Sequence, residues 1–253
     1  MSYLQFHQVT VNGVRGRDMV LGDQTALSVI VLASALVRGE TYIATAIQLA
    51  NNFNVYVVEL PGSGSSSRLS NGWELTDYAA WVAGFIDAFA LHSTTVIGHS
   101  HSGGIVILLV SLHTGKVGRL VVADSIGVGG PFSFWPVAAG RIIDTVVHEC
   151  SLAARAWHHV AYNAIAHPSN YFHQVRLCLK TNLDAQAASI QIPILLAWGE
   201  WDRTIPVRFA HQLKQAIPHC TLYVSAQGSH AWPITHAKEF ADVTGKWVQK
   251  AAD

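Results

Sequence analysis

The sequence predicts an α/β fold in which helices cover both faces of a mostly parallel central sheet. Short apolar runs alternate along the chain with longer amphipathic stretches, and this order is typical of parallel sheets. Half of the 253 residues are hydrophobic and only 13% are charged, whereas an average domain carries roughly 25% charge. This composition excludes a disordered chain and predicts a large buried core.

The expected strands are short runs of β-branched and apolar residues bounded by small or turn-forming residues. Residues 8–21 are expected to form an antiparallel hairpin at the start of the chain. The buried strands expected after it are residues 28–32, 54–60, 94–97, 119–123, 194–198 and 221–224. Continuous apolar runs of this length are typical of parallel strands that are buried on both faces.

The expected helices fall between these strands. They are residues 41–51, 75–91, 103–113, 207–217 and 237–250. The alternation stops between about residues 130 and 188, where helical patterns at 137–156 and 157–166 are followed by Pro168 and no strand is evident. A helical insertion between two strands is most simply a lid over the carboxyl edge of the sheet, where α/β proteins bind ligands. We therefore expect a core of residues 1–129 and 189–253 and a helical cap of residues 130–188.

The strongest local motif is the sequence VIGHSHSGG at residues 96–104. An expected strand runs into a small-x-Ser-x-small turn and then into an expected helix, which is the context of a nucleophile elbow. Ser100 is the candidate nucleophile, and the small residues Gly98 and Ser102 would allow the sharp turn. The usual fifth residue of the motif is glycine, so Ser102 itself is kept as an alternative nucleophile in a shifted register.

A serine hydroxyl needs a base, and the base needs an acid that orients it. His230 lies on a glycine-flanked loop after the last expected strand, from which its ring could reach the carboxyl edge of the sheet. Asp202 follows the preceding strand and is the candidate acid, with Asp124 at the end of an earlier strand as the alternative. The chain order of Ser100, Asp202 and His230 is the order expected for an α/β-hydrolase arrangement.

These motifs together resemble the α/β-hydrolase fold over nearly the whole chain. The matching pieces are residues 59–66 (ELPGSGSS), 98–103 (GHSHSG), 192–202, which include WGEWD, and 228–230 (GSH). The resemblance implies a single-domain serine hydrolase with a helical cap, in which Ser100, Asp202 and His230 are nucleophile, acid and base. It also implies an oxyanion hole formed by the backbone N–H groups of Ala35 and His101. The family commonly has His-Gly before the first of these positions, whereas this chain has Ala33-Ser34.

Composition and motifs exclude several other classes of function. Sixteen basic and sixteen acidic residues give a net charge of zero with His neutral, so no basic surface for nucleic acid is expected. No apolar run approaches the ~20 residues that span a membrane. Three cysteines without a pairing pattern favour free thiols in the cytoplasm. No cofactor or metal is expected, since no P-loop is present and His148-Glu149 does not continue into His-Glu-x-x-His. The oligomeric state stays open.

The predicted function is cleavage of a small apolar carboxylic ester or lactone through an acyl-enzyme on Ser100. Aromatic residues of the expected cap are interpreted mainly as packing the cap onto the core, and partly as walls of an apolar pocket. His99 and His101 flank Ser100, and this His-Ser-His run is similar to that of cofactor-free dioxygenases of the same fold. A dioxygenase or lyase with His230 as general base is therefore an alternative, as is a ligand-binding protein with little turnover.

Overall fold

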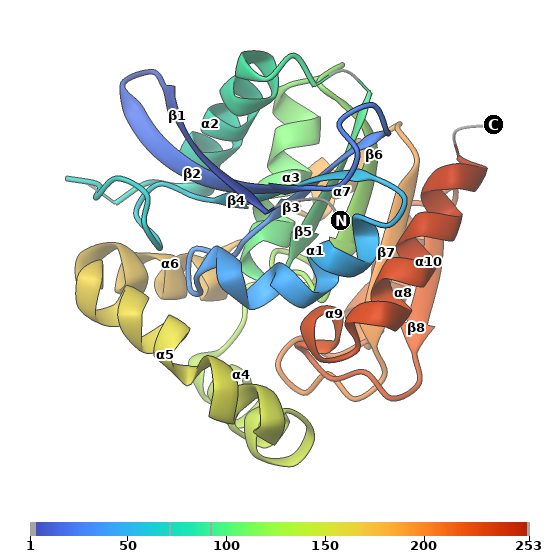
Figure 1. The fold of residues 1–253 in the computed structure, drawn as a ribbon. Coiled ribbons are helices and arrows are strands. Elements are labelled where there is room, and N and C mark those ends of the chain that lie inside the picture. The colour runs from blue at the N-terminus through green and yellow to red at the C-terminus, as the bar shows by residue number, and fades with distance from the viewer. Residues whose placement is uncertain (1–3, 71, 92, 252–253) are drawn as a thin grey trace.

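The computed structural model describes residues 4–70, 72–91 and 93–251, and its centre is an eight-stranded sheet with helices on both faces (Figure 1). The strand order is β1-β2-β4-β3-β5-β6-β7-β8. The strands are β1 (Gln5–Val11), β2 (Val14–Leu21), β3 (Ser28–Leu32), β4 (Asn54–Glu59), β5 (Thr94–His99), β6 (Val117–Ala123), β7 (Ile194–Gly199) and β8 (Thr221–Ser225). The prediction of a mostly parallel sheet with helices on both faces is confirmed.

The expected hairpin is present at one edge of the sheet. Strands β1 and β2 pair antiparallel and are joined by Asn12 and Gly13, whose φ angles are 49° and 78°. Two consecutive positive φ angles twist a two-residue turn in the sense that matches a hairpin. Strand β2 pairs antiparallel with β4, and every later pairing, from β3–β4 to β7–β8, is parallel.

Alternating residues of the central strands divide the core into two layers. In β3, Ile30 and Leu32 face the layer that includes α2 (Leu75–Ala88), α3 (His101–Leu112) and α8 (Arg208–Ala216). Val29 and Val31 face the other layer, which includes α1 (Ile43–Leu49), the short α9 (Trp232–Thr235) and α10 (Ala237–Lys250). A strand that is apolar on both faces can be buried only between two helical layers, so this residue pattern explains the three-layer arrangement.

The region between β6 and β7 is helical, as expected, but the helices differ from the predicted ones. They are α4 (Phe134–Ile143), a π-helix (Asp144–His148), α5 (Cys150–Ala166), α6 (Pro168–Lys180) and α7 (Asp184–Ala188). The predicted break between residues 156 and 157 is wrong, because α5 continues through it and the chain breaks at Glu149 instead. In Figure 1, α4 and α5 lie outside the helical layers that cover the sheet.

The remaining helices of this region approach the core. Helix α7 packs against α3 and α8, although it lies inside the residues that we expected to form the cap. The division into a core and a cap of residues 130–188 stays a prediction. None of the helices among the described residues combines the length and the hydropathy of a membrane-spanning segment.

The topology explains where a site would form. From β3 the chain moves outward to β4 on one side and then returns to β5 on the other. Ligands of open α/β sheets bind beyond the carboxyl ends of the strands at this point of reversal. The loops that follow β3, β5, β7 and β8 carry the predicted site residues to that edge.

Candidate active site

Ser100 occupies the sharp turn between β5 and α3. Its φ of 55° and ψ of −118° lie outside the regions that L-residues ordinarily adopt, as a nucleophile elbow requires. A side chain at Gly98 would bring its Cβ within 2.5 Å of the Ser102 carbonyl oxygen, so only glycine fits there. The turn places Ser100 at the start of α3, where free N–H groups favour a developing negative charge.

Ser102, the alternative nucleophile, has a structural position under the elbow. Its side chain is fully buried, and its hydroxyl donates to the Leu32 carbonyl at 2.7 Å and accepts from the His99 N–H at 3.0 Å. The hydroxyl thereby ties the elbow to the end of β3, which explains how serine replaces the usual glycine. Among the described residues, no basic side chain is hydrogen-bonded to this hydroxyl, so the geometry favours Ser100.

The structure brings Ser100, His230 and Asp202 into one hydrogen-bonded row. His230 Nε2 lies 2.9 Å from Ser100 Oγ, and His230 Nδ1 lies 2.9 Å from Asp202 Oδ2. The other carboxylate oxygen, Asp202 Oδ1, accepts the Ile205 N–H at 2.7 Å. His230 and Asp202 are buried, whereas Ser100 is half-buried and lines a cavity. This arrangement can remove the proton of Ser100 and return it to a leaving group.

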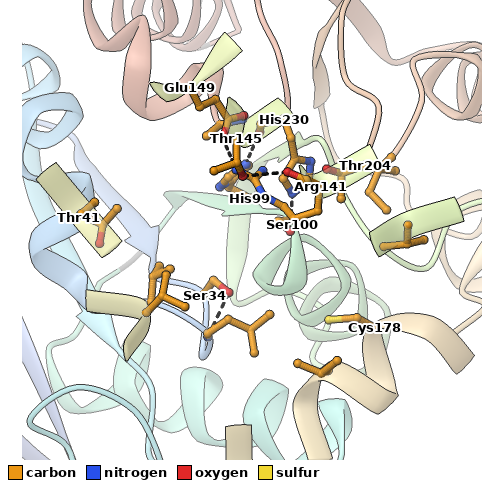
Figure 2. Close-up of a pocket in the computed structure, with 18 of the residues that line it drawn as sticks. Ser34, Thr41, His99, Ser100, Arg141, Thr145, Glu149, Cys178, Thr204 and His230 are labelled. Atoms are coloured by element: carbon orange, nitrogen blue, oxygen red, sulfur yellow. Dashed lines mark hydrogen bonds and ion pairs between the residues drawn. The ribbon is translucent and has the colours of Figure 1, made fainter. Parts of the chain in front are cut away.

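A cavity of about 670 Å³ opens in front of this row (Figure 2). Ser100, His99 and His230 contribute to its wall at one end, where Arg141 and Glu149 also lie. Most of the wall is apolar and comes from the core and the inserted helices, including Val37, Ile126, Val137, Leu152, Val160 and Val175. Pockets of about 300–1,000 Å³ with a few polar groups at one end are typical small-molecule sites.

Comparison with known proteins assigns the fold family. Residues 30–243 match the family model described as the alpha/beta hydrolase family. The chain belongs to this family. The expected α/β-hydrolase fold is therefore confirmed, and the relatives of the chain are hydrolases.

The relatives of this alpha/beta hydrolase differ in what they act on. A 2-hydroxymuconate semialdehyde hydrolase of Pseudomonas putida is 27% identical over 219 residues, which is 78% of this chain and 77% of that protein. A pimeloyl-[acyl-carrier protein] methyl ester esterase of Chromobacterium violaceum is 26% identical over 246 residues, covering 88% and 95%. The enol-lactonase of Burkholderia xenovorans LB400 has the same fold, with a TM-score of 0.81, 17% identity and coverage of 96% and 100%.

Asp124, the alternative acid of this hydrolase, lies near Asp202 but is not hydrogen-bonded to His230 among the described residues. Its Oδ1 accepts the Gly199 N–H at 2.9 Å, and the carboxyl group lies beside Asp202 and Trp232. Burial raises the pKa of this carboxyl well above its ordinary value of 3.8, and the neighbouring Asp202 charge raises it further. Because His230 Nδ1 contacts Asp202 and the Asp124 carboxyl binds the Gly199 N–H instead, the structure favours Asp202 as the acid.

The raised pKa of Asp124 predicts how this residue affects the stability of the fold. A carboxyl whose pKa is higher in the folded than in the unfolded state destabilises the fold above pH 3.8. The substitution Asp124→Asn would keep an oxygen for the Gly199 N–H, and asparagine tolerates the φ of 43° at this position. We expect Asp124→Asn to raise Tm at pH 7–8, by about 2–4 °C for each kcal/mol of stability gained, and to keep ester turnover.

Thermal unfolding from pH 4 to 8 checks this expectation. The gain should shrink as the pH falls toward 4, because the carboxyl of the unfolded chain then becomes increasingly protonated as well. A Tm difference that does not change with pH, or one that is negative at pH 8, would contradict it.

Each of the two histidines beside Ser100 is hydrogen-bonded to other parts of the protein. His99 donates from Nε2 to the His230 carbonyl at 2.7 Å and accepts from the Tyr42 hydroxyl at Nδ1, at 2.9 Å. Burial, together with the nearby His230, lowers the pKa of His99 to about 3. His101 donates from Nε2 to Gln174 Oε1 at 2.8 Å, and burial lowers its pKa to about 4. Both rings are therefore neutral above pH 5 and are poor candidates for a catalytic base.

The oxyanion hole remains a prediction. The N–H groups of Ala35 and His101 have no protein acceptor among the described residues. In the Ala33-Ser34 segment, the Ser34 hydroxyl accepts the Leu36 N–H at 3.2 Å, so this side chain shapes the loop where the family commonly has His-Gly. The arrangement leaves both predicted N–H donors free for a developing oxyanion.

Sequence reasoning missed three charged groups beside the site. Arg141 and Glu149 form an ion pair at the cavity, and Asp144 is buried against the loop that carries Asp202. Arg141 lies in the last turn of α4, Asp144 begins the π-helix and Glu149 directly follows it. None of the three belongs to a sequence motif, and the π-helix was not expected, so no signal in the sequence points to them.

Proposed function

We propose that this chain is a serine hydrolase that cleaves a small apolar carboxylic ester or lactone. Ser100 attacks the carbonyl, His230 takes the serine proton and returns it to the leaving alcohol, and Asp202 orients His230. The N–H groups of Ala35 and His101 hold the oxyanion, and water then releases the acid. The observation that carries the proposal is the 2.9 Å contact between Ser100 Oγ and His230 Nε2 at the wall of the cavity.

Two properties of the cavity support a neutral substrate. Its wall is mostly apolar, and the positive charge of Arg141 is already paired with the buried carboxylate of Glu149. A small ester or lactone would bury its acyl chain against this wall and present its carbonyl to Ser100. Two of the similar proteins are named for cleavage of a methyl ester, on a pimeloyl-[acyl-carrier protein], and of an enol-lactone.

A second candidate is a substrate that carries a carboxylate. The observation that favours it is Arg141, which lines the same cavity as Ser100 (Figure 2). Arginine binds carboxylates through two parallel hydrogen bonds, and only one of its terminal nitrogens is recorded as bonded to Glu149. The 2-hydroxymuconate semialdehyde hydrolase among the relatives is named for a substrate with such a group.

The oxygenase alternative receives less support. It needs the same base, His230, but the flanking rings of His99 and His101 are engaged with Tyr42, the His230 carbonyl and Gln174. Neither ring can approach a substrate anion without losing a buried hydrogen bond. A ligand-binding protein with little turnover would not require the row of Ser100, His230 and Asp202.

A matched pair of esters tests the proposal. p-Nitrophenyl butyrate and p-nitrophenyl hemisuccinate have acyl chains of the same length and differ in a terminal carboxylate. We expect turnover of both, with kcat/KM at least about tenfold higher for the butyrate, since one unpaired buried charge costs more than about 1.4 kcal/mol. A preference for the hemisuccinate would select the second candidate. No turnover of either ester, together with oxygen uptake on an aromatic substrate, would contradict the hydrolase.

The cellular setting is also part of the proposal. Cys150, Cys178 and Cys220 are free, as expected for a chain that works in the reducing cytoplasm. The proposed partner is the small-molecule substrate alone, with no cofactor, metal or nucleic acid.

A further inference from the structure

Glu149 of the inserted region holds the loop that carries His230. Its Oε1 accepts hydrogen bonds from the Ser229 hydroxyl at 2.7 Å and the Ala231 N–H at 2.8 Å, so it binds the residues on both sides of His230. Its Oε2 is paired with Arg141. The carboxylate is 1% exposed, and although burial raises the pKa of Glu149, Arg141 and these hydrogen bonds bring the pKa below 4.5. Glu149 is thus a charged, buried acceptor at the base of the site.

Asp144 holds the loop that carries Asp202 in the same way. Its Oδ2 accepts the Thr204 N–H at 2.9 Å, the Thr204 hydroxyl at 2.7 Å and the Arg203 N–H at 3.1 Å. The side chain is fully buried. These bonds begin at the residue directly after Asp202, so a shift of this carboxylate would move the acid itself. Asp144 and Glu149 therefore hydrogen-bond the two loops that carry Asp202 and His230, whose side chains must contact each other.

The π-helix explains why one short segment reaches both loops. The Glu149 N–H donates to the Asp144 carbonyl at 2.9 Å, which is the i→i+5 bond of a π turn. In an α-helix, positions five apart point about 140° away from each other. The wider π turn brings them to the same side of the helix axis, and here both carboxylates face the core.

Other polar residues of the inserted helices also hydrogen-bond loops that carry site residues. Asn163 of α5 donates to the Ala35 carbonyl at 3.3 Å, on the loop of the predicted oxyanion hole. Gln174 of α6 accepts from His101, directly after Ser100. Each of the four loops that carry a site residue therefore has a buried polar partner from the inserted helices.

We propose that the inserted helices set the alignment of the catalytic residues, and that Asp144 and Glu149 are positioning residues for Asp202 and His230. The inference rests on the proposed function, because alignment matters for turnover only if these residues react. Both contacts of His230 are 2.9 Å long, and its two partners come from loops after different strands. The loops β7–α8 and β8–α9 have to be fixed relative to each other, and the 144–149 segment spans them.

The first test measures turnover of p-nitrophenyl butyrate by variants that remove each carboxylate. We expect Glu149→Ala to lower kcat by about 100-fold, as displacement of a reacting group by about 1 Å does, with KM nearly unchanged. Asp144→Ala should cause a smaller loss, because the Ile205 N–H also holds Asp202. Glu149→Gln keeps one oxygen for the Ser229 hydroxyl and the Ala231 N–H, so it should restore most of the lost kcat.

A matched control separates alignment from general stability. Asp184 also lies in the inserted region and accepts a core backbone N–H, that of Gly129, at 2.9 Å, but it has no recorded bond to a loop of the site. Asp184→Ala should keep the kcat of the wild type even if it lowers Tm. Equal losses of kcat in Asp184→Ala and Glu149→Ala, measured on fully folded protein, would overturn the proposal.

Hydrogen exchange tests the alignment without using the reaction. Glu149→Ala should accelerate exchange in residues 229–232, and Asp144→Ala should accelerate it in residues 203–205, each leaving the other loop less affected. Unchanged exchange in both loops would overturn the proposal even if the wild type hydrolyses esters. A wild type that cleaves no ester would remove the proposed function, while the exchange result would still decide whether the two carboxylates fix the loops.

Discussion

Ser100→Ala is expected to lower kcat/KM for p-nitrophenyl butyrate by about 10⁴-fold or more, which is about 5 kcal/mol of transition-state stabilisation. The loss is large because alanine offers no group that can form the acyl-enzyme. Ser102 cannot substitute for it, since its hydroxyl is buried and bonded to the Leu32 carbonyl. The residual rate would come from the oxyanion donors and from binding in the cavity.

A serine two residues away provides the control. Ser102→Gly restores the residue that the family motif usually has, at the cost of the hydrogen bonds to β3 and to the His99 N–H. We expect this variant to keep most of its turnover on the same ester. The reverse result, with Ser100→Ala active and Ser102→Gly inactive, would move the nucleophile to Ser102.

Asp202→Asn is expected to lower kcat by about 10⁴-fold, the size of effect that follows when the orienting acid of a triad becomes an amide. In the present structure Asp202 Oδ1 accepts from Ile205 and Oδ2 accepts from His230. An asparagine oxygen would stay with the Ile205 N–H, which leaves its NH₂ facing His230 Nδ1. His230 would then carry its proton on Nε2 and could not accept the proton of Ser100.

Asp124→Asn is the matched comparison for this variant, because Asp124 is a buried carboxyl group beside Asp202. Steady-state kinetics of the two variants on p-nitrophenyl butyrate should differ by several orders of magnitude. A loss of activity in Asp124→Asn with retention in Asp202→Asn would assign the acid to Asp124.

Much of the fold could be predicted from the sequence because the core strands are locally unambiguous. Runs such as residues 28–32 and 194–198 are almost entirely apolar, and short runs of this kind are typical of strands inside a covered sheet. Helix α10 was expected at residues 237–250 and is found there, because its apolar residues repeat at helical spacing. Ser100, His230 and Asp202 could be selected because each follows an expected strand in the order of a known arrangement.

The inserted region was less predictable, since its helices depend on tertiary contacts more than on local pattern. Nothing local distinguishes the π turn at Asp144–His148 from a continuous α-helix. The break at Glu149 places its carboxylate against Ser229 and Ala231, which lie 80 and 82 positions later in the chain. Asp144 likewise meets Thr204 at a separation of 60 positions. Single-sequence patterns do not report such pairings.

Covalent labelling of Ser100 tests the central claim most directly. The folded protein would be incubated with a fluorophosphonate, digested and analysed by mass spectrometry. The account predicts one adduct, on the peptide that contains Ser100, present in Ser102→Gly and absent in Ser100→Ala. An adduct on another residue, or no adduct on a folded protein, would contradict it.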